Sequence, residues 1–146
     1  MTQEQKDLLI KDLCGRLSHG VKCKILEINE VQILGSIQYD GEDTLFDFWE
    51  DDQKIQFGYQ FYLSEFKPYL FPLSSMTDEQ RDELYKMGWY LDEDKIYSCF
   101  RNYDDVNYKT HIDCFELVNW CYKNNLDING LIPIGLAIDA TGLNIY

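Results

Sequence analysis

KPYLFPLSSMTDEQRDELYKMG, residues 67–88, lies between a region whose sequence pattern predicts strands and a region whose pattern predicts mainly helices. Its two prolines fix φ and favour extended backbone at the residues before them, so we expect residues 67–73 to form an extended apolar strap on the core. Thr77 and Gln80 then have the spacing of a capping box, in which each side chain bonds the other residue's backbone N–H. We therefore expect a helix that begins after Thr77 and ends near Gly88.

The region before the strap predicts one helix followed by short strands. Thr2 and Gln5 form a second capping-box pattern, and leucines at helical spacing predict a helix over residues 3–17. From residue 21 onward apolar residues alternate with polar ones, which is typical of half-buried strands. Gly35 indicates a bulge or a close backbone approach. The four predicted strands are residues 21–25, 31–37, 45–49 and 55–61.

Two arrangements remain open for residues 21–73. The first expectation is a bent antiparallel meander that resembles a small SH3-like barrel, and the second is a flatter meander covered by helices. After the strap and its helix, we expect a fifth strand over residues 96–100, a loop over residues 102–109 and a helix over residues 112–124. Residues 127–138 are apolar and interrupted by glycine and proline. We expect this tail to be buried, because it would otherwise expose a large apolar surface.

These patterns predict one α+β domain over residues 1–146. A chain of this length buries enough surface for a single core, and its aromatic content of 15% argues against disorder. We expect the N-terminal helix within residues 1–20 and the bent antiparallel meander with its strap within residues 21–73. Residues 74–146 are expected to be mainly helical and to end in the buried tail.

The composition also indicates a compartment. No run of about 18 apolar residues is present to span a membrane, and the polar start MTQEQKDLLI lacks the features of a signal peptide. The five cysteines have no close-paired spacing, which favours reduced thiols over a disulfide framework. We therefore expect a cytoplasmic protein with no membrane contact, and the sequence leaves its oligomeric state open.

The net charge of −13 is concentrated in the middle of the chain. Residues 40–94 hold fifteen acidic and four basic side chains, whereas residues 1–39 are balanced. This excess disfavours binding to nucleic acid, which requires lysine and arginine against phosphate. It is compatible with a basic protein partner, and equally with a surface that only keeps the protein in solution.

One run holds seven carboxylates and no basic residue within thirteen positions. Three interpretations compete: solvated hairpin tips, a divalent-metal site, and an acidic surface that meets a basic partner. The spacing lacks the D-x-[DN]-x-[DN]-G frame of a calcium loop. The candidate binding residues of the acidic surface are Asp40, Glu42, Asp43, Asp47, Glu50, Asp51 and Asp52.

No motif in the sequence indicates catalysis. His111 and Cys114 are three residues apart, and Cys99 and Cys121 are the remaining ligands that a metal site would use. However, no CxxC pair supports such a site, and a cysteine nucleophile would need a histidine that only the fold brings near. The glycines match no nucleotide-binding pattern. We therefore expect no catalytic residue, no metal and no cofactor, and the alternative is a small enzyme or metal-binding protein whose site has no recognised motif.

Two segments resemble a family of short uncharacterised proteins from gut Bacteroidetes and their phages and mobile elements. These are KPYLFPLSSMTDEQRDEL at residues 67–84 and DINGLIPIGLAIDATGLNIY at residues 127–146. The family pairs a KPYLRPLSSMT strap with a DYRGLI…GLA segment, and this chain differs at Phe71, Ile128 and Asn129. The resemblance implies a bacterial cytoplasm and an accessory role, and it implies no activity.

The leading hypothesis from the sequence is therefore a non-enzymatic accessory protein of a phage or mobile element. It would act in the cytoplasm of the bacterial host by binding an unidentified protein, through the acidic surface if that partner is basic.

Overall fold

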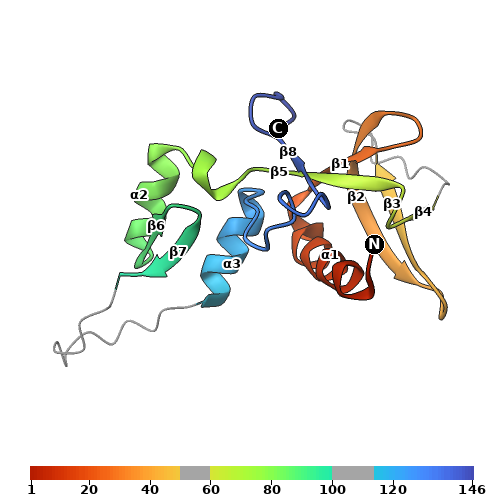
Figure 1. Cartoon of the computed structure of the whole chain (residues 1–146), viewed down its shortest axis with the longest axis horizontal. Coiled ribbons are helices and arrows are strands. Elements are labelled where there is room, and N and C mark those ends of the chain that lie inside the picture. Colours follow the sequence, from red (N-terminus) through yellow and green to blue (C-terminus); the bar gives the residue numbers. More distant parts are fainter. Residues whose placement is uncertain (50–59, 100–113) are drawn as a thin grey trace.

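The computed structural model of the chain describes residues 1–49, 60–99 and 114–146, and shows an α+β fold (Figure 1). The helices are α1 (Gln3–Arg16), α2 (Asp78–Lys86) and α3 (Cys114–Lys123), with 3-10 turns at Leu17–His19 and Leu73–Ser75. The strands are β1 (Lys22–Ile25), β2 (Glu30–Tyr39), β3 (Thr44–Trp49), β4 (Phe61–Tyr62), β5 (Phe66–Leu70), β6 (Trp89–Asp92), β7 (Lys95–Ser98) and β8 (Ile138–Asp139). Within these ranges no helix has the length and apolar character that crossing a membrane requires.

Both predicted capping boxes are confirmed. At the start of α1 the Thr2 hydroxyl accepts from the Gln5 N–H at 3.2 Å, and the Gln5 side chain accepts from the Thr2 N–H at 2.9 Å. Thr77 and Gln80 repeat the arrangement at the start of α2. Each pair satisfies N–H groups that a helix leaves without a partner in its first turn, so both helices begin where the sequence predicts.

Six strands form one sheet in the order β4-β3-β2-β1-β5-β8. All neighbours are antiparallel except β5 and β8, which are parallel. No closed barrel is found within the described residues, so the first expectation, an SH3-like barrel, is corrected to an open and largely antiparallel sheet. The physical reason is that β5 pairs with β8 on the edge that closure of the meander would have used. The predicted strand over residues 55–61 lies mostly outside the described residues, which include Phe61 at the start of β4.

The strap is an inner strand of the sheet rather than a segment laid over the core. Its residues 67–70 belong to β5, with Cys23 of β1 opposite Pro68 on one side and Ile138 of β8 opposite Tyr69 on the other. A proline is tolerated here because of the hydrogen-bond alternation of an antiparallel ladder. The Leu26 N–H donates to the Glu65 carbonyl at 2.8 Å, which places the nitrogen of Pro68 on the side away from β1.

The tail continues the same edge of the sheet and adds a side-chain bridge to it. The Tyr146 hydroxyl accepts from the Lys22 N–H at 3.1 Å and donates to the Tyr69 carbonyl at 2.8 Å. It therefore stands in the position where β1 and β5 would otherwise form their next ladder bond. Burial of this hydroxyl raises the pKa of Tyr146 well above its usual range, because the charged form would lose its hydration.

The predicted bulge at Gly35 is confirmed. The pairing register between β2 and β3 shifts between Leu34 and Ser36. The indole ring of Trp49 lies directly against Gly35, and a Cβ atom at that position would be 2.5 Å from the Trp49 Nε1 atom. A glycine is required here because β2 bends under an aromatic ring that leaves no room for a side chain.

The region after the strap contains a hairpin that the sequence analysis did not predict. Strand β6 pairs with β7 through a two-residue turn in which Glu93 has a φ of 51°. Strands of four residues are too short to show a clear alternation, so the sequence indicated only the second of them, as residues 96–100. Helix α3 confirms the described part of the helix predicted over residues 112–124, whereas the predicted loop over residues 102–109 lies outside the described residues.

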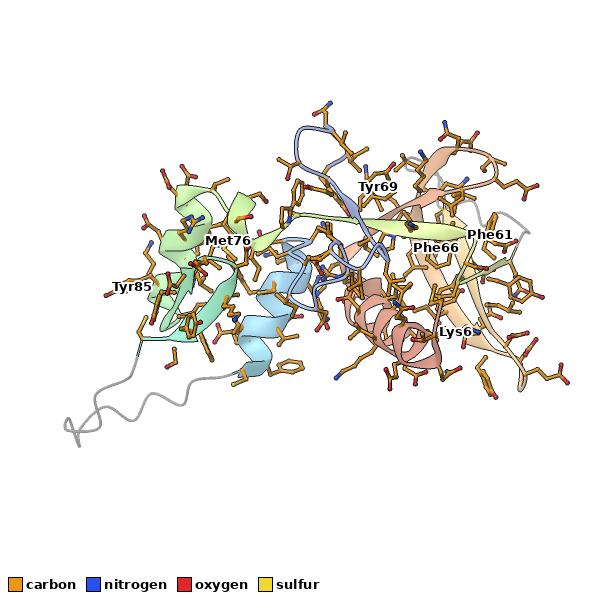
Figure 2. The ribbon with its side chains drawn as sticks, viewed as in Figure 1. Lys6, Phe61, Phe66, Tyr69, Met76 and Tyr85 are labelled. Carbon is orange, nitrogen blue, oxygen red and sulfur yellow. The ribbon has the colours of Figure 1, made fainter. Side chains whose placement is uncertain are left out.

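The buried apolar side chains form two cores. The first lies between α1 and the sheet, where Phe66 contacts the rings of Phe46 and Phe48; in Figure 2 the Phe66 side chain is on the α1 side of β5. The tail contributes Leu131, Leu136 and Ala137 to this core, so the prediction that it is buried is confirmed for these residues, whereas residues 133–135 are exposed. The second core consists of Leu73, Met76, Leu84, Cys121 and Leu126, packed against the β6–β7 hairpin.

The tail tests how much of the stability of the first core depends on residues far along the chain. Leu131 is fully buried, so Leu131→Ala should lower the free energy of unfolding by about 2–5 kcal/mol through lost burial and a residual cavity. Ile134 is 46% exposed, and Ile134→Ala should change the free energy of unfolding by less than about 0.5 kcal/mol. Urea unfolding followed by tryptophan fluorescence measures both. Equal effects of the two substitutions would contradict the packing of the tail against the sheet.

Candidate functional site

The candidate acidic surface begins at the turn between β2 and β3. One oxygen of the Asp40 carboxylate accepts from the N–H groups of Asp43 at 2.8 Å and of Glu42 at 2.9 Å. These two hydrogen bonds stabilise the charged form and lower the pKa of Asp40 below its usual range. Asp40 therefore stabilises the turn, and its carboxylate is already hydrogen-bonded to backbone N–H groups of the protein itself.

The rest of this turn faces solvent. We define the hairpin tip as residues 39–43, in which the Glu42 and Asp43 side chains are exposed. Tyr39 is 71% exposed, and its hydroxyl donates to the Gly41 carbonyl at 2.9 Å. The hairpin tip thus presents two unshielded carboxylates beside an exposed aromatic ring, on a backbone fixed by side-chain hydrogen bonds.

Asp47 does not belong to an exposed surface, which corrects its place among the candidate residues. It is 3% exposed and lies on β3 opposite Ser36. Its carboxylate accepts from the Ser36 hydroxyl at 2.6 Å and from the Gln38 side-chain amide at 2.8 Å. A carboxylate that is removed from water must be compensated in this way, so its role is to join two strands. The candidates Glu50, Asp51 and Asp52 lie outside the described residues.

A second group of acidic residues in the described part of the chain is at the other end of the molecule. Helix α2 exposes four carboxylates, and Figure 1 shows that α2 and the β2–β3 turn lie at opposite ends of the longest axis. One of the four, that of Glu83, accepts from the Trp120 indole N–H of α3 at 3.0 Å. Among the described residues, the charge that the sequence concentrates in residues 40–94 is therefore divided in space and does not form one continuous acidic surface. The four exposed residues are Asp78, Glu79, Asp82 and Glu83.

The cysteines do not gather around a common point within the described residues. Cys114 is exposed at the start of α3, Cys99 is half-buried after β7, and Cys121 is buried in the second core. Among residues 1–49, 60–99 and 114–146, no group of three or more histidine, cysteine, aspartate or glutamate side chains is placed to hold a metal ion. His111, the other ligand considered from sequence, lies outside these ranges.

The buried cysteines are poor nucleophiles for a physical reason. Burial raises the pKa of Cys121 to about 12 and raises the pKa of Cys23 even further, because a thiolate would lose its hydration in an apolar core. The charge of Arg16 opposes this effect at both thiols and is the smaller cause. At neutral pH both side chains are therefore small apolar groups that fill the core.

This difference predicts a clear pattern of thiol labelling. In the native protein, iodoacetamide should modify the exposed Cys14 and Cys114 first, and should modify Cys23 and Cys121 only after unfolding in urea. Peptide mass spectrometry at successive times measures each site separately. Rapid native labelling of Cys121 would contradict its burial and would renew the case for a reactive cysteine.

The most organised polar cluster is one that the sequence analysis missed. Asp12 and Arg16 are both fully buried on α1, and they form a two-pronged ion pair with distances of 2.6 and 3.0 Å. The Arg16 Nη2 atom also donates to the Leu126 carbonyl at 2.7 Å, and the Asn129 side chain donates to Asp12 at 2.8 Å. The guanidinium lies over the Tyr122 ring, 4.7 Å from its centroid. The pair therefore connects α1 to the end of α3 and to the tail.

A glycine permits this close approach. Gly15 faces Tyr122, and a Cβ atom at position 15 would overlap the tyrosine ring at 2.1 Å from its Cε2 atom. A glycine within a helix costs about 0.5–1 kcal/mol relative to alanine, and this contact explains why one is present. A signal for the cluster is in the sequence: Asp12 and Arg16 are four residues apart on the same helix face as Leu9 and Leu13. Charges on an apolar stripe at this spacing indicate a buried pair.

Removing one member of the Asp12–Arg16 pair should destabilise the protein more than replacing both members with apolar residues. Asp12→Ala leaves a buried guanidinium without its counter-charge and should lower the free energy of unfolding by about 3–5 kcal/mol. The double variant Asp12→Leu with Arg16→Met removes both charges and should lose less than that. Lys11→Ala, at an exposed neighbouring position, serves as the control. Urea unfolding measures all three, and a double variant less stable than Asp12→Ala would contradict this account.

No protein-family model, no curated protein and no solved structure matches the chain.

Proposed function

We propose that the protein is a non-enzymatic accessory protein of a phage or mobile element that acts by binding another protein in the bacterial cytoplasm. The observation that carries the proposal is the construction of the hairpin tip. Glu42 and Asp43 project into solvent from a turn that Asp40 and Tyr39 fix with three hydrogen bonds. A preformed charged turn loses little conformational freedom on binding, which favours recognition by a partner.

The chemistry of the hairpin tip favours a basic partner. Its two free carboxylates attract a lysine-rich or arginine-rich surface, and the exposed ring of Tyr39 offers a face for a guanidinium. Charges at the rim of an interface act mainly on the rate of association. The resemblance of the strap and tail to proteins of phages and mobile elements supports the biological setting of the proposal.

The test compares two variants that carry the same charge change. Glu42→Gln with Asp43→Asn neutralises the hairpin tip and keeps Asp40, which holds the turn. Asp82→Asn with Asp94→Asn neutralises two exposed carboxylates on α2 and the β6–β7 turn. A partner is captured from bacterial lysate with the native protein, and its association rate is then measured with each form.

We expect the hairpin-tip variant to associate several-fold more slowly at 0.05 M salt, a condition in which the Debye length exceeds about 10 Å. This difference should shrink in 0.5 M salt, and the control variant should associate at nearly the native rate. Equal rates for all three proteins would contradict binding through the hairpin tip. An equal loss in both variants would show that only the overall charge matters.

A further inference from the structure

The face of the sheet opposite α1 carries basic residues in an otherwise acidic protein. On β1 the side chains of Cys23 and Ile25 point into the first core, so those of Lys22 and Lys24 point to the other face. On β5 the core residue Phe66 places the next side chain, Lys67, on that same outer face. We define the basic face as Lys22, Lys24 and Lys67 together with the neighbouring Val31, Ile33 and Trp49.

The centre of the basic face is electrostatically unfavourable as it stands. Lys24 lies directly opposite Lys67 in the ladder between β1 and β5, and both side chains are half-buried. Like charges at directly opposite positions destabilise a sheet. Neither ammonium group forms an ion pair with a carboxylate of the described residues. A negatively charged group bound between the two lysines would relieve this repulsion, and the fold itself supplies no such group within those residues.

Apolar surface lies beside Lys24, on the side away from Lys67. Val31 of β2 is opposite Lys24, is 41% exposed and borders an open hollow of about 230 Å³. Ile33 and Ile145 add further apolar lining to this hollow, and Lys22, Gln32 and Asn144 line the rest of it. Pockets that hold drug-sized ligands measure about 300–1,000 Å³, so this one suits a single side chain better than a cofactor.

We propose that the basic face binds an acidic segment of a partner protein. Carboxylates of the segment contact Lys24 and Lys67, and one apolar side chain next to them enters the hollow beside Val31. Charge complementarity identifies this occupant: the site is positive, whereas the protein around it carries a net charge of −13. A nucleic acid is disfavoured because its long row of phosphates would also meet the acidic surroundings.

This surface is separate from the hairpin tip, and the two proposals are independent. The hairpin tip would bind a basic partner, whereas the basic face selects an acidic one. Lys24, Lys67 and Val31 occupy the row of the sheet formed by β5, β1 and β2, while Glu42 and Asp43 lie beyond the end of β2. Failure of either proposal therefore leaves the other unchanged.

The experiment uses the whole protein and labelled peptides. The probe is a set of fluorescein-labelled ten-residue peptides of aspartate and glutamate with one central apolar residue, which differs between members. In a matched control set, asparagine and glutamine replace aspartate and glutamate. A ten-nucleotide single-stranded DNA tests whether the face binds a nucleic acid instead. The variants are Lys24→Gln with Lys67→Gln, Val31→Asp, and the control Lys6→Gln with Lys11→Gln. Figure 2 shows Lys6 on α1, on the other side of the sheet.

Fluorescence anisotropy should show binding of at least one acidic peptide and none of its uncharged counterpart. Lys24→Gln with Lys67→Gln should weaken this binding at least ten-fold, and Val31→Asp should weaken it as well, whereas Lys6→Gln with Lys11→Gln should leave it within two-fold. Removal of the like-charge pair should keep or raise the unfolding temperature, so the loss of binding is not a loss of folding.

Several outcomes would overturn the proposal. One is the absence of binding to every acidic peptide at about 1 mM protein, which means a dissociation constant above about 1 mM. Another is equal binding by the native protein and the Lys24→Gln, Lys67→Gln variant. An equal loss in the control variant would assign the binding to overall charge. Tighter binding of the DNA than of any peptide would replace the acidic protein segment by a nucleic acid.

Discussion

The buried ion pair between Asp12 and Arg16 is the constraint on which the arrangement of the other elements depends. Removing each charge from water costs several kcal/mol, and the ion pair and its hydrogen bonds must offset this desolvation free energy. The partners that do so come from three places in the chain: α1 itself, the Leu126 carbonyl after α3, and the Asn129 side chain of the tail. A shift of α3 or the tail away from α1 would remove the hydrogen bonds that this buried pair forms with Leu126 and Asn129.

The strap connects the two cores that this ion pair holds together. Its first half is β5 in the sheet, and its second half continues to Phe71, whose N–H and carbonyl bond the backbone of Asn125 and Asp127. The ring of Phe71 also packs against Tyr146, with 5.6 Å between centroids. One short extended segment is thus bonded to β1, to β8 and to the end of α3. The prolines that bracket it favour this extended form before any partner is present.

Three groups of charged residues stand out within residues 1–49, 60–99 and 114–146. Exposed carboxylates lie on the hairpin tip and on α2 at opposite ends, and lysines lie between them on one face of the sheet. Each group combines with a different feature: a fixed turn, a helix N-terminus, and an apolar hollow. Our two proposals assign a basic partner to the hairpin tip and an acidic partner to the basic face. A protein that binds two partners of opposite charge would act as an adaptor between them.

The sequence alone determined the features whose bonds join residues a few positions apart. The capping boxes of α1 and α2 and the exposed turn at residues 40–43 depend on residue type and spacing. For these, the hydrogen-bond partners are two or three residues away, so any fold of the chain that keeps the local backbone keeps the bond.

Only the tertiary structure decided which distant residues meet. It placed Tyr69 opposite Ile138, brought Lys24 opposite Lys67, buried Asp47 beneath Ser36 and Gln38, and joined Arg16 to Leu126 across 110 positions. Strands with similar alternation compete for the same neighbours, and the native pairing is favoured because it buries a large apolar surface and gives most buried polar groups a hydrogen-bond partner. The choice of strand pairing depends on contacts from the whole chain, so no single stretch of the sequence predicts it.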